Sequence, residues 1–120
     1  MKMIYSTFTE KESMKENIRF FKAYTGYLKK IKRSFKVVKG SYKGVKELSL
    51  VTDQNLMTLK LILEARNQES ALLLDNENNA SLIYINGSKM SLGKLKQVDR
   101  TLALTKEGWS RIDGKYFIIE

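Results

Sequence analysis

The chain has 120 residues, of which 42% are hydrophobic and 29% charged, and its formal net charge is +9. These values are typical of one globular domain and exclude a disordered chain. The sequence has no Cys and no His. This excludes disulfides, thiolate nucleophiles, most zinc sites and the usual general base near neutral pH. No stretch is apolar enough for a signal peptide or a membrane-spanning helix, so we expect a cytoplasmic protein.

The charges are segregated along the chain. Residues 1–50 hold thirteen Lys and Arg against four acids, residues 51–85 hold two against five, and residues 86–120 hold seven against four. Solubility alone needs no such segregation, because interspersed charges serve it equally well. Two basic ends around an acidic, apolar middle predict a polyanion that is bound at two places.

The N-terminal part has the pattern of two helices. Thr9 and Glu12 have the spacing of a capping box, and apolar residues then recur at helical spacing over residues 14–28. Gly26 is expected to end this helix. A second short helix is expected over residues 27–35, followed by a short strand or loop near Val37.

The middle of the chain has the pattern of strands. Residues 47–51 alternate in polarity and precede a turn at residues 53–55. Residues 57–65 also alternate, although they are rich in helix formers, and we expect a strand there. Residues 71–74 and 81–85 flank a turn-rich run and predict a β-hairpin. Together these segments predict a four-stranded antiparallel meander.

The last third is expected to return to helix and then to end in a hairpin. Ser91 is expected to cap one helix and Asp99 a second, over residues 100–107. The pair Asp113-Gly114 predicts a tight turn between strands at 110–112 and 115–119. We therefore expect one compact α+β domain over residues 1–120: a basic helical unit (1–46), a central antiparallel meander (47–86) and a helix-turn-helix with a wing (87–120). Helical units at both ends suggest, as a hypothesis, approximate internal two-fold symmetry.

The segment SLGKLKQVDRTLALTKEGWSRIDGKYFI, residues 91–118, resembles the winged helix-turn-helix of the MerR and excisionase families. The overall layout also resembles TraN-like DNA-binding proteins of Gram-positive conjugative secretion systems. This resemblance implies double-stranded DNA as the partner, with a helix in the major groove and a wing on the backbone. The basic run of the N-terminal part adds further candidates. The candidate DNA-binding residues are Lys29, Lys30, Lys32, Arg33, Lys36, Lys94, Lys96, Arg100, Thr101, Thr105, Lys106, Arg111, Lys115 and Tyr116.

The function expected from these observations is regulation of, or assistance to, conjugative transfer or another mobile element through DNA binding. We expect a monomer or weak dimer that is not an enzyme, with no catalytic residue, metal, cofactor, membrane contact or small-molecule substrate, and with other transfer proteins as further partners. The alternative is an inhibitor or adaptor from a mobile element that docks on an acidic protein. RNA binding through the sheet is disfavoured, since Tyr84 is the one aromatic residue in the central strands.

Overall fold

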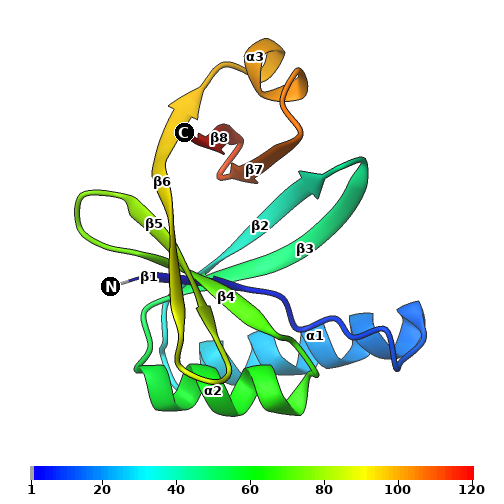
Figure 1. Ribbon diagram of the computed structural model, residues 1–120. Helices are drawn as coiled ribbons and strands as arrows, with labels where there is room; N and C mark the ends of the chain where they lie inside the picture. Colours follow the sequence, from blue (N-terminus) through cyan, green and yellow to red (C-terminus); the bar gives the residue numbers. More distant parts are fainter. Residues whose placement is uncertain (1) are drawn as a thin grey trace.

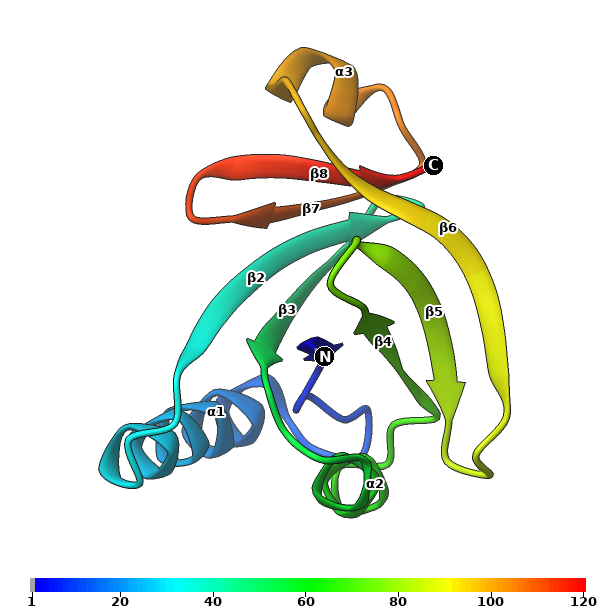
Figure 2. The ribbon, with the colours of Figure 1, turned by 90° about the vertical axis from the view of Figure 1, so that its left-hand side faces the viewer.

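Eight antiparallel strands close into a barrel in the computed structural model, which describes residues 2–120. Around the barrel the strands follow the order β1-β3-β2-β7-β8-β6-β5-β4 (Figures 1 and 2). The elements in chain order are β1 (Lys2–Tyr5), α1 (Met14–Lys30), β2 (Phe35–Tyr42), β3 (Val45–Thr52), α2 (Leu56–Ala65), β4 (Ser70–Leu74), β5 (Asn79–Tyr84), β6 (Lys89–Val98), α3 (Arg100–Leu104), β7 (Gly108–Ile112) and β8 (Lys115–Ile119).

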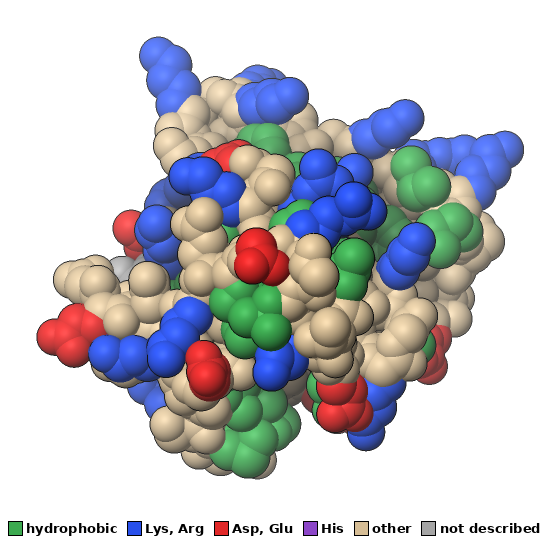
Figure 3. Space-filling model, turned by 90° about the horizontal axis from the view of Figure 1, so that it is seen from above, with side chains coloured by type: hydrophobic (Ala, Val, Ile, Leu, Met, Phe, Trp, Pro, Cys, Tyr) green, Lys and Arg blue, Asp and Glu red, His purple; other side chains and the backbone are tan. Residues whose placement is uncertain are grey.

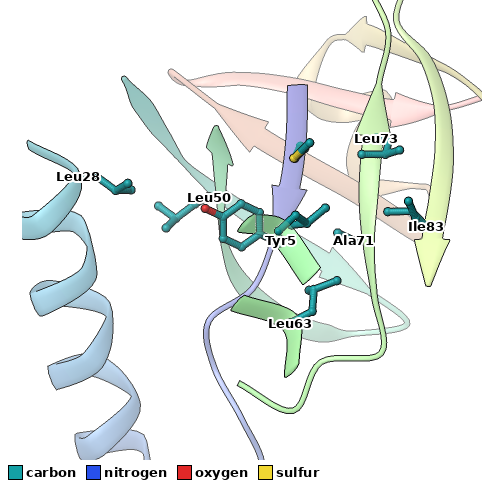
Figure 4. Packing of buried hydrophobic residues seen from close by; sticks show 9 residues of the cluster. Tyr5, Leu28, Leu50, Leu63, Ala71, Leu73 and Ile83 are labelled. Carbon is teal, nitrogen blue, oxygen red and sulfur yellow. The ribbon is translucent and has the colours of Figure 1, made fainter. Parts of the chain in front are cut away.

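The period of two along each strand divides the apolar residues into two cores. Met3 and Tyr5 of β1 point out of the barrel, where they pack with the buried Leu28 of α1 and Leu63 of α2 (Figure 4). Ile4, between them in the chain, belongs to a second buried cluster, to which the facing strands contribute Val38, Val51, Leu74, Ala80 and Leu95. Strands β1, β3, β4 and β5 therefore have one face under the helices and one face toward the barrel interior.

Helix α1 is one continuous helix, so the prediction of two helices separated at Gly26 is wrong. The capping box also lies four residues later than predicted: Ser13 accepts a hydrogen bond from the backbone of Glu16, and the Glu16 carboxylate accepts one from the Ser13 amide. Open space surrounds the Cβ position of Gly26, and its φ is not positive. The helix therefore passes through this glycine at a modest cost.

Residues 56–65 form helix α2 and not the predicted strand. The side chain of Asn55 caps the helix by accepting a hydrogen bond from the Thr58 amide at 2.8 Å. Leu59 and Leu63, four residues apart, are 1% and 2% exposed in the core beneath the sheet. In this segment both helix propensity and the cap favour the helix, and they prevail over the weak alternation.

Residues 89–98 form strand β6, which corrects the helix predicted behind Ser91. Gly93 has a φ of +127°, and a Cβ there would come within 2.5 Å of the carbonyl oxygen of Glu120. The C-terminal backbone lies this close because Lys94 and Glu120 exchange two backbone hydrogen bonds. This close approach, which needs glycine, helps β6 to pair with β8 and so close the barrel.

The predicted fold class is therefore wrong: the chain forms mostly an eight-stranded barrel, and helical units with a winged helix-turn-helix do not form at its ends. The predicted four-stranded meander is also absent, because α2 interrupts it, and the symmetry hypothesis loses the matching helical units from which it was drawn. The β4–β5 hairpin and the β7–β8 hairpin are confirmed. Among the helices formed by residues 2–120, none is long and apolar enough to cross a membrane.

Candidate active site

The barrel interior is not completely filled by side chains. A cavity of about 1230 Å³ extends from the interior to the surface between the β2–β3 hairpin and the start of α1. Barrels of eight strands have room for interior side chains or for one small ligand. The volume exceeds the range of about 300–1,000 Å³ that is usual for small-molecule sites, so a ligand of nucleoside size fits. Its inward-facing lining residues include Ile4, Val38, Gly40, Tyr42, Glu47, Ser49, Ser70, Leu72, Leu82, Leu95, Ser110 and Phe117.

The lining of the cavity is acidic, although the chain as a whole is strongly basic. Two ammonium groups, of Lys46 and Lys106, line it. Five carboxylates do so as well: those of Glu10, Glu12, Glu47, Glu107 and Glu120. Cations from outside the lining pair with three of these carboxylates, so Glu10 and Glu47 remain beside Lys46 and Lys106. Two carboxylates of the lining are therefore available to a cationic group of a ligand.

Glu47 is the carboxylate best placed for such a ligand. Three of the other lining carboxylates already have a cationic partner: Glu12 binds Arg66 at 2.8 Å, Glu107 lies 3.6 Å from Lys43, and Glu120 lies 3.5 Å from Lys96. Within residues 2–120, Glu10 and Glu47 have no such ion pair, but only Glu47 lies on a strand of the barrel. It lies on β3 directly opposite Gly40 of β2, so its neighbour across the ladder has no side chain.

Tyr42 places an aromatic ring at the mouth of the cavity. Its side chain shares the inward-facing side of β2 with Gly40, and the residue is 55% exposed. Gly108 on β7 is paired with Tyr42, and a Cβ at Gly108 would come within 3.0 Å of the ring. The ammonium of Lys43 lies 5.3 Å from the ring centroid, within the range of a cation–π contact. The ring therefore already has a cation near it.

The loop between β1 and α1, which lines the cavity, is fixed by one buried arginine. Arg66, the C-cap of α2, is 5% exposed and stacks on the ring of Phe20 with a guanidinium-to-centroid distance of 3.8 Å. It donates to the Thr7 carbonyl at 2.6 Å, to both carboxylate oxygens of Glu12 and to the side chain of Asn17. Asn17 in turn binds the backbone of Thr9 through two hydrogen bonds. These contacts determine the path of residues 7–12.

A second polar network lies beneath the helices. The Tyr5 hydroxyl lies 2.9 Å from the Tyr24 hydroxyl, donates to Gln54 at 3.0 Å and accepts from Thr52 at 3.3 Å. Burial raises the pKa of the Tyr5 phenol well above its usual value, and the hydrogen bond from Thr52 only partly opposes this. Tyr5 therefore stays protonated at neutral pH and cannot act as a base.

The candidate residues predicted from the sequence lie in two separate regions. Lys29 and Lys30 end α1, Lys32 and Arg33 follow it, and Lys36 begins β2. The other nine lie in β6, in α3 and the residues just after it, and in the β7–β8 hairpin. Helix α3 lies at the opposite end of the molecule from α1 (Figure 1). Four of the nine line a second, smaller hollow: Arg100, Arg111, Lys115 and Tyr116. Only Lys106 lines the large cavity. The structure tests none of the DNA contacts predicted for these fourteen residues.

The sequence analysis missed the inward-facing residues of the β2–β3 hairpin. Glu47 and Ser49 alternate with apolar residues, a pattern typical of a strand whose polar side faces solvent, whereas here this side faces the cavity. No local signal distinguishes solvent from an open barrel interior. Among residues 2–120, no cluster of acidic side chains has the geometry to hold a metal ion.

A family model described as the S-adenosylmethionine lyase family matches residues 3–120. The curated proteins gave no match. The family match overturns the resemblance to MerR, excisionase and TraN-like proteins. For the same reason, three further predictions are wrong. The sequence predicted a DNA-binding regulator of conjugation, a protein that is not an enzyme, and the absence of a small-molecule substrate. A lyase family indicates an enzyme with a small-molecule substrate.

Proposed function

The chain belongs to the S-adenosylmethionine lyase family, and on this premise we propose that it binds S-adenosylmethionine in the acidic cavity of its barrel and cleaves a carbon–sulfur bond of this substrate. The Glu47 carboxylate, which lines the cavity together with the Tyr42 ring and has no ion pair within residues 2–120, is the observation that carries the assignment to the cavity. S-adenosylmethionine contains a sulfonium and an ammonium group, so cations predominate in it. A cavity lined by a carboxylate without an ion pair and by an aromatic ring fits such a substrate.

Glu47 and Tyr42 are the residues that we assign to the cationic part of the substrate. The Glu47 carboxylate has no cationic partner within residues 2–120, and charge-assisted hydrogen bonds to an ammonium group are the stronger kind. The face of the Tyr42 ring attracts a sulfonium through the same quadrupole that attracts Lys43. Leu72, Leu82 and Phe117 supply apolar surface for the adenosyl part.

A lyase breaks the carbon–sulfur bond without adding water and without an oxidant. The bonding electron pair leaves with sulfur, which becomes a neutral thioether. Two routes satisfy this balance: a base removes a proton from the carbon next to the one that leaves sulfur, or the carboxylate of the substrate displaces sulfur and closes a lactone ring. The second route needs no protein base. A chain without His or Cys favours this route.

The first experiment incubates the purified protein with S-adenosylmethionine and follows the appearance of 5′-methylthioadenosine by liquid chromatography and mass spectrometry. The site is tested with Glu47→Gln, which removes the charge and keeps the shape. We expect kcat/KM to fall about 10- to 100-fold, which corresponds to a lost charged hydrogen bond of about 1.5–3 kcal/mol. The matched control is Glu64→Gln, since Glu64 is exposed on α2 and does not line the cavity.

The outcomes separate the reaction from its site. No thioether product from the wild-type protein would contradict the proposed activity. If Glu47→Gln leaves turnover unchanged, the proposed activity stands, but the substrate does not bind in the part of the cavity around β3.

A further inference from the structure

The outer face of the barrel around β2 and β7 holds positive charge that the proposed reaction does not use. Lys39 of β2 and Arg111 of β7 are directly opposite each other, and both are exposed. Side chains at directly opposed positions share one face of the sheet, and like charges there destabilise the fold. An acid at either position would remove this repulsion.

A hollow of about 480 Å³ adjoins this pair. It is lined by Gln97, Val98, Asp99, Arg100, Arg111, Gly114, Lys115 and Tyr116. Its one carboxylate, of Asp99, accepts the hydrogen bond from the Leu102 amide at 2.8 Å that caps α3. The nearby acids Asp113 and Glu120 bind Lys36 and Lys96.

Within residues 2–120, no ion pair neutralises four of the cations in this region. They are Lys39, Arg100, Arg111 and Lys115. Lys and Arg side chains predominate over acids on the upper face of the molecule, where α3 and the β7–β8 hairpin lie (Figures 1 and 3). A cationic substrate cannot account for this charge, because a positive surface repels it.

We infer that this hollow is a second ligand site, separate from the cavity, for a small anion of the nucleoside di- or triphosphate class. Arg111 and Arg100 offer guanidinium groups, which bind phosphate oxygens in a bidentate manner. The ring of Tyr116 lies 5.8 Å from the Arg111 guanidinium and 5.3 Å from the ring of Trp109. This half-buried aromatic pair offers a face on which a base stacks, and arginines beside it hold the phosphates.

Trp109 is the chain's only tryptophan. It lies near Tyr116 and also lines the large cavity, so the Arg111 variant is needed to assign a fluorescence change to the hollow. The experiment titrates ATP and, separately, inorganic tripolyphosphate at constant ionic strength, with excitation at 295 nm. The variants are Arg111→Gln and Lys39→Gln, with Lys22→Gln, exposed on α1, as the control. We expect saturable binding of ATP that Arg111→Gln weakens about tenfold or more and that Lys22→Gln leaves unchanged. ATP binding tighter than tripolyphosphate binding supports the stacked base.

Lys39→Gln gives a second, independent measurement. Because it removes the repulsion with Arg111, it should raise the melting temperature of the ligand-free protein while it weakens ATP binding. If Lys39 only stabilised the fold, Lys39→Gln would lower both the melting temperature and the affinity for ATP. The inference is overturned if neither anion changes the fluorescence or if Arg111→Gln binds ATP as tightly as the wild type. It is also overturned if excess S-adenosylmethionine displaces ATP in equilibrium dialysis, a measurement that does not depend on Trp109, which also lines the cavity. Arg111 does not line the cavity, so thioether formation should be unchanged in its variant.

Discussion

Gly40 and Glu47 are directly opposite each other on β2 and β3, and both line the cavity of the barrel. A Cβ at Gly40 would meet the Trp109 carbonyl oxygen at 3.5 Å and the Ser110 hydroxyl at 3.9 Å, which are ordinary contacts. Its φ lies outside the left-handed region. The backbone at this position therefore does not need a glycine. The missing side chain instead leaves space beside the one lining carboxylate of the β2–β3 hairpin.

Gly40→Val should consequently separate substrate binding from stability. Valine suits a strand better than glycine does, so the melting temperature should stay the same or rise. The added methyl groups enter the cavity beside Glu47, and we expect KM for S-adenosylmethionine to rise about tenfold, as for an overpacked site that costs 1–3 kcal/mol. Gly40→Ala is the control and should change KM less than threefold, a factor equivalent to about 0.6 kcal/mol. A valine variant with a lower melting temperature would contradict the argument.

The route of bond cleavage is tested with substrate deuterated at the β-carbon of its methionine part. Elimination removes one β-deuterium, whereas displacement by the substrate carboxylate retains both. The two four-carbon products are isomers when unlabelled, so the retained label and the proton NMR spectrum must distinguish them. Because the chain has no His or Cys, we expect both deuterium atoms to be retained and a rate that changes little between pH 6 and 8. Loss of one deuterium would instead give Glu47 the role of a base.

One tight turn and one helix cap could be predicted from the sequence, whereas the caps predicted at Thr9 and Ser91 are wrong. Asp113 and Gly114 both have positive φ, as the two-residue turn between β7 and β8 requires. The side chain of Asp99 caps α3 as expected. These features depend on a few adjacent residues, so no knowledge of the rest of the chain is needed to predict them.

Features that depend on distant partners could not be predicted. Leu92 and Leu95 have helical spacing, but in β6 Leu95 is buried inside the barrel while Leu92 remains 36% exposed. The strand forms because β5 and β8 pair with it, and neither partner is visible from residues 91–98 alone. Strand β1 was missed for a similar reason, since four residues carry too little pattern.

The candidate site was missed because the charges of consecutive residues were added, whereas the site consists of residues that only the fold brings onto one surface. The first fifty residues are strongly basic, yet Glu10, Glu12 and Glu47 from this segment line the cavity. Only the closed barrel brings them together with Glu107 and Glu120. An acidic site within a basic protein therefore has no signature in the local sequence.

Arg66→Met should destabilise the protein and also impair the site. The change leaves the half-buried Glu12 carboxylate without its bidentate partner and the Thr7 carbonyl without its donor. We expect a loss of about 3–5 kcal/mol in the free energy of unfolding, measured by urea denaturation, because the remaining charge is poorly solvated. Arg19→Met, on the exposed side of α1, is the control and should change stability by less than about 0.5 kcal/mol. A loss below 1 kcal/mol for Arg66→Met would contradict its role as the fixing residue of loop 7–12.

Tyr5→Phe tests the network beneath the helices and its dependence on pH. The variant removes the hydroxyl that Tyr24, Thr52 and Gln54 share, so at pH 7 we expect a loss of about 1–3 kcal/mol. Burial raises the pKa of the Tyr5 phenol, so above about pH 10 the unfolded chain releases a proton that the folded chain retains. The stability that this tyrosine contributes is therefore complete below pH 10 and declines above it. Urea denaturation at pH 7 and pH 11 should show the difference between wild type and Tyr5→Phe shrinking or reversing, whereas Tyr27→Phe, at an exposed tyrosine, should follow the wild type at both pH values. A difference that grows with pH would contradict the direction of the pKa shift.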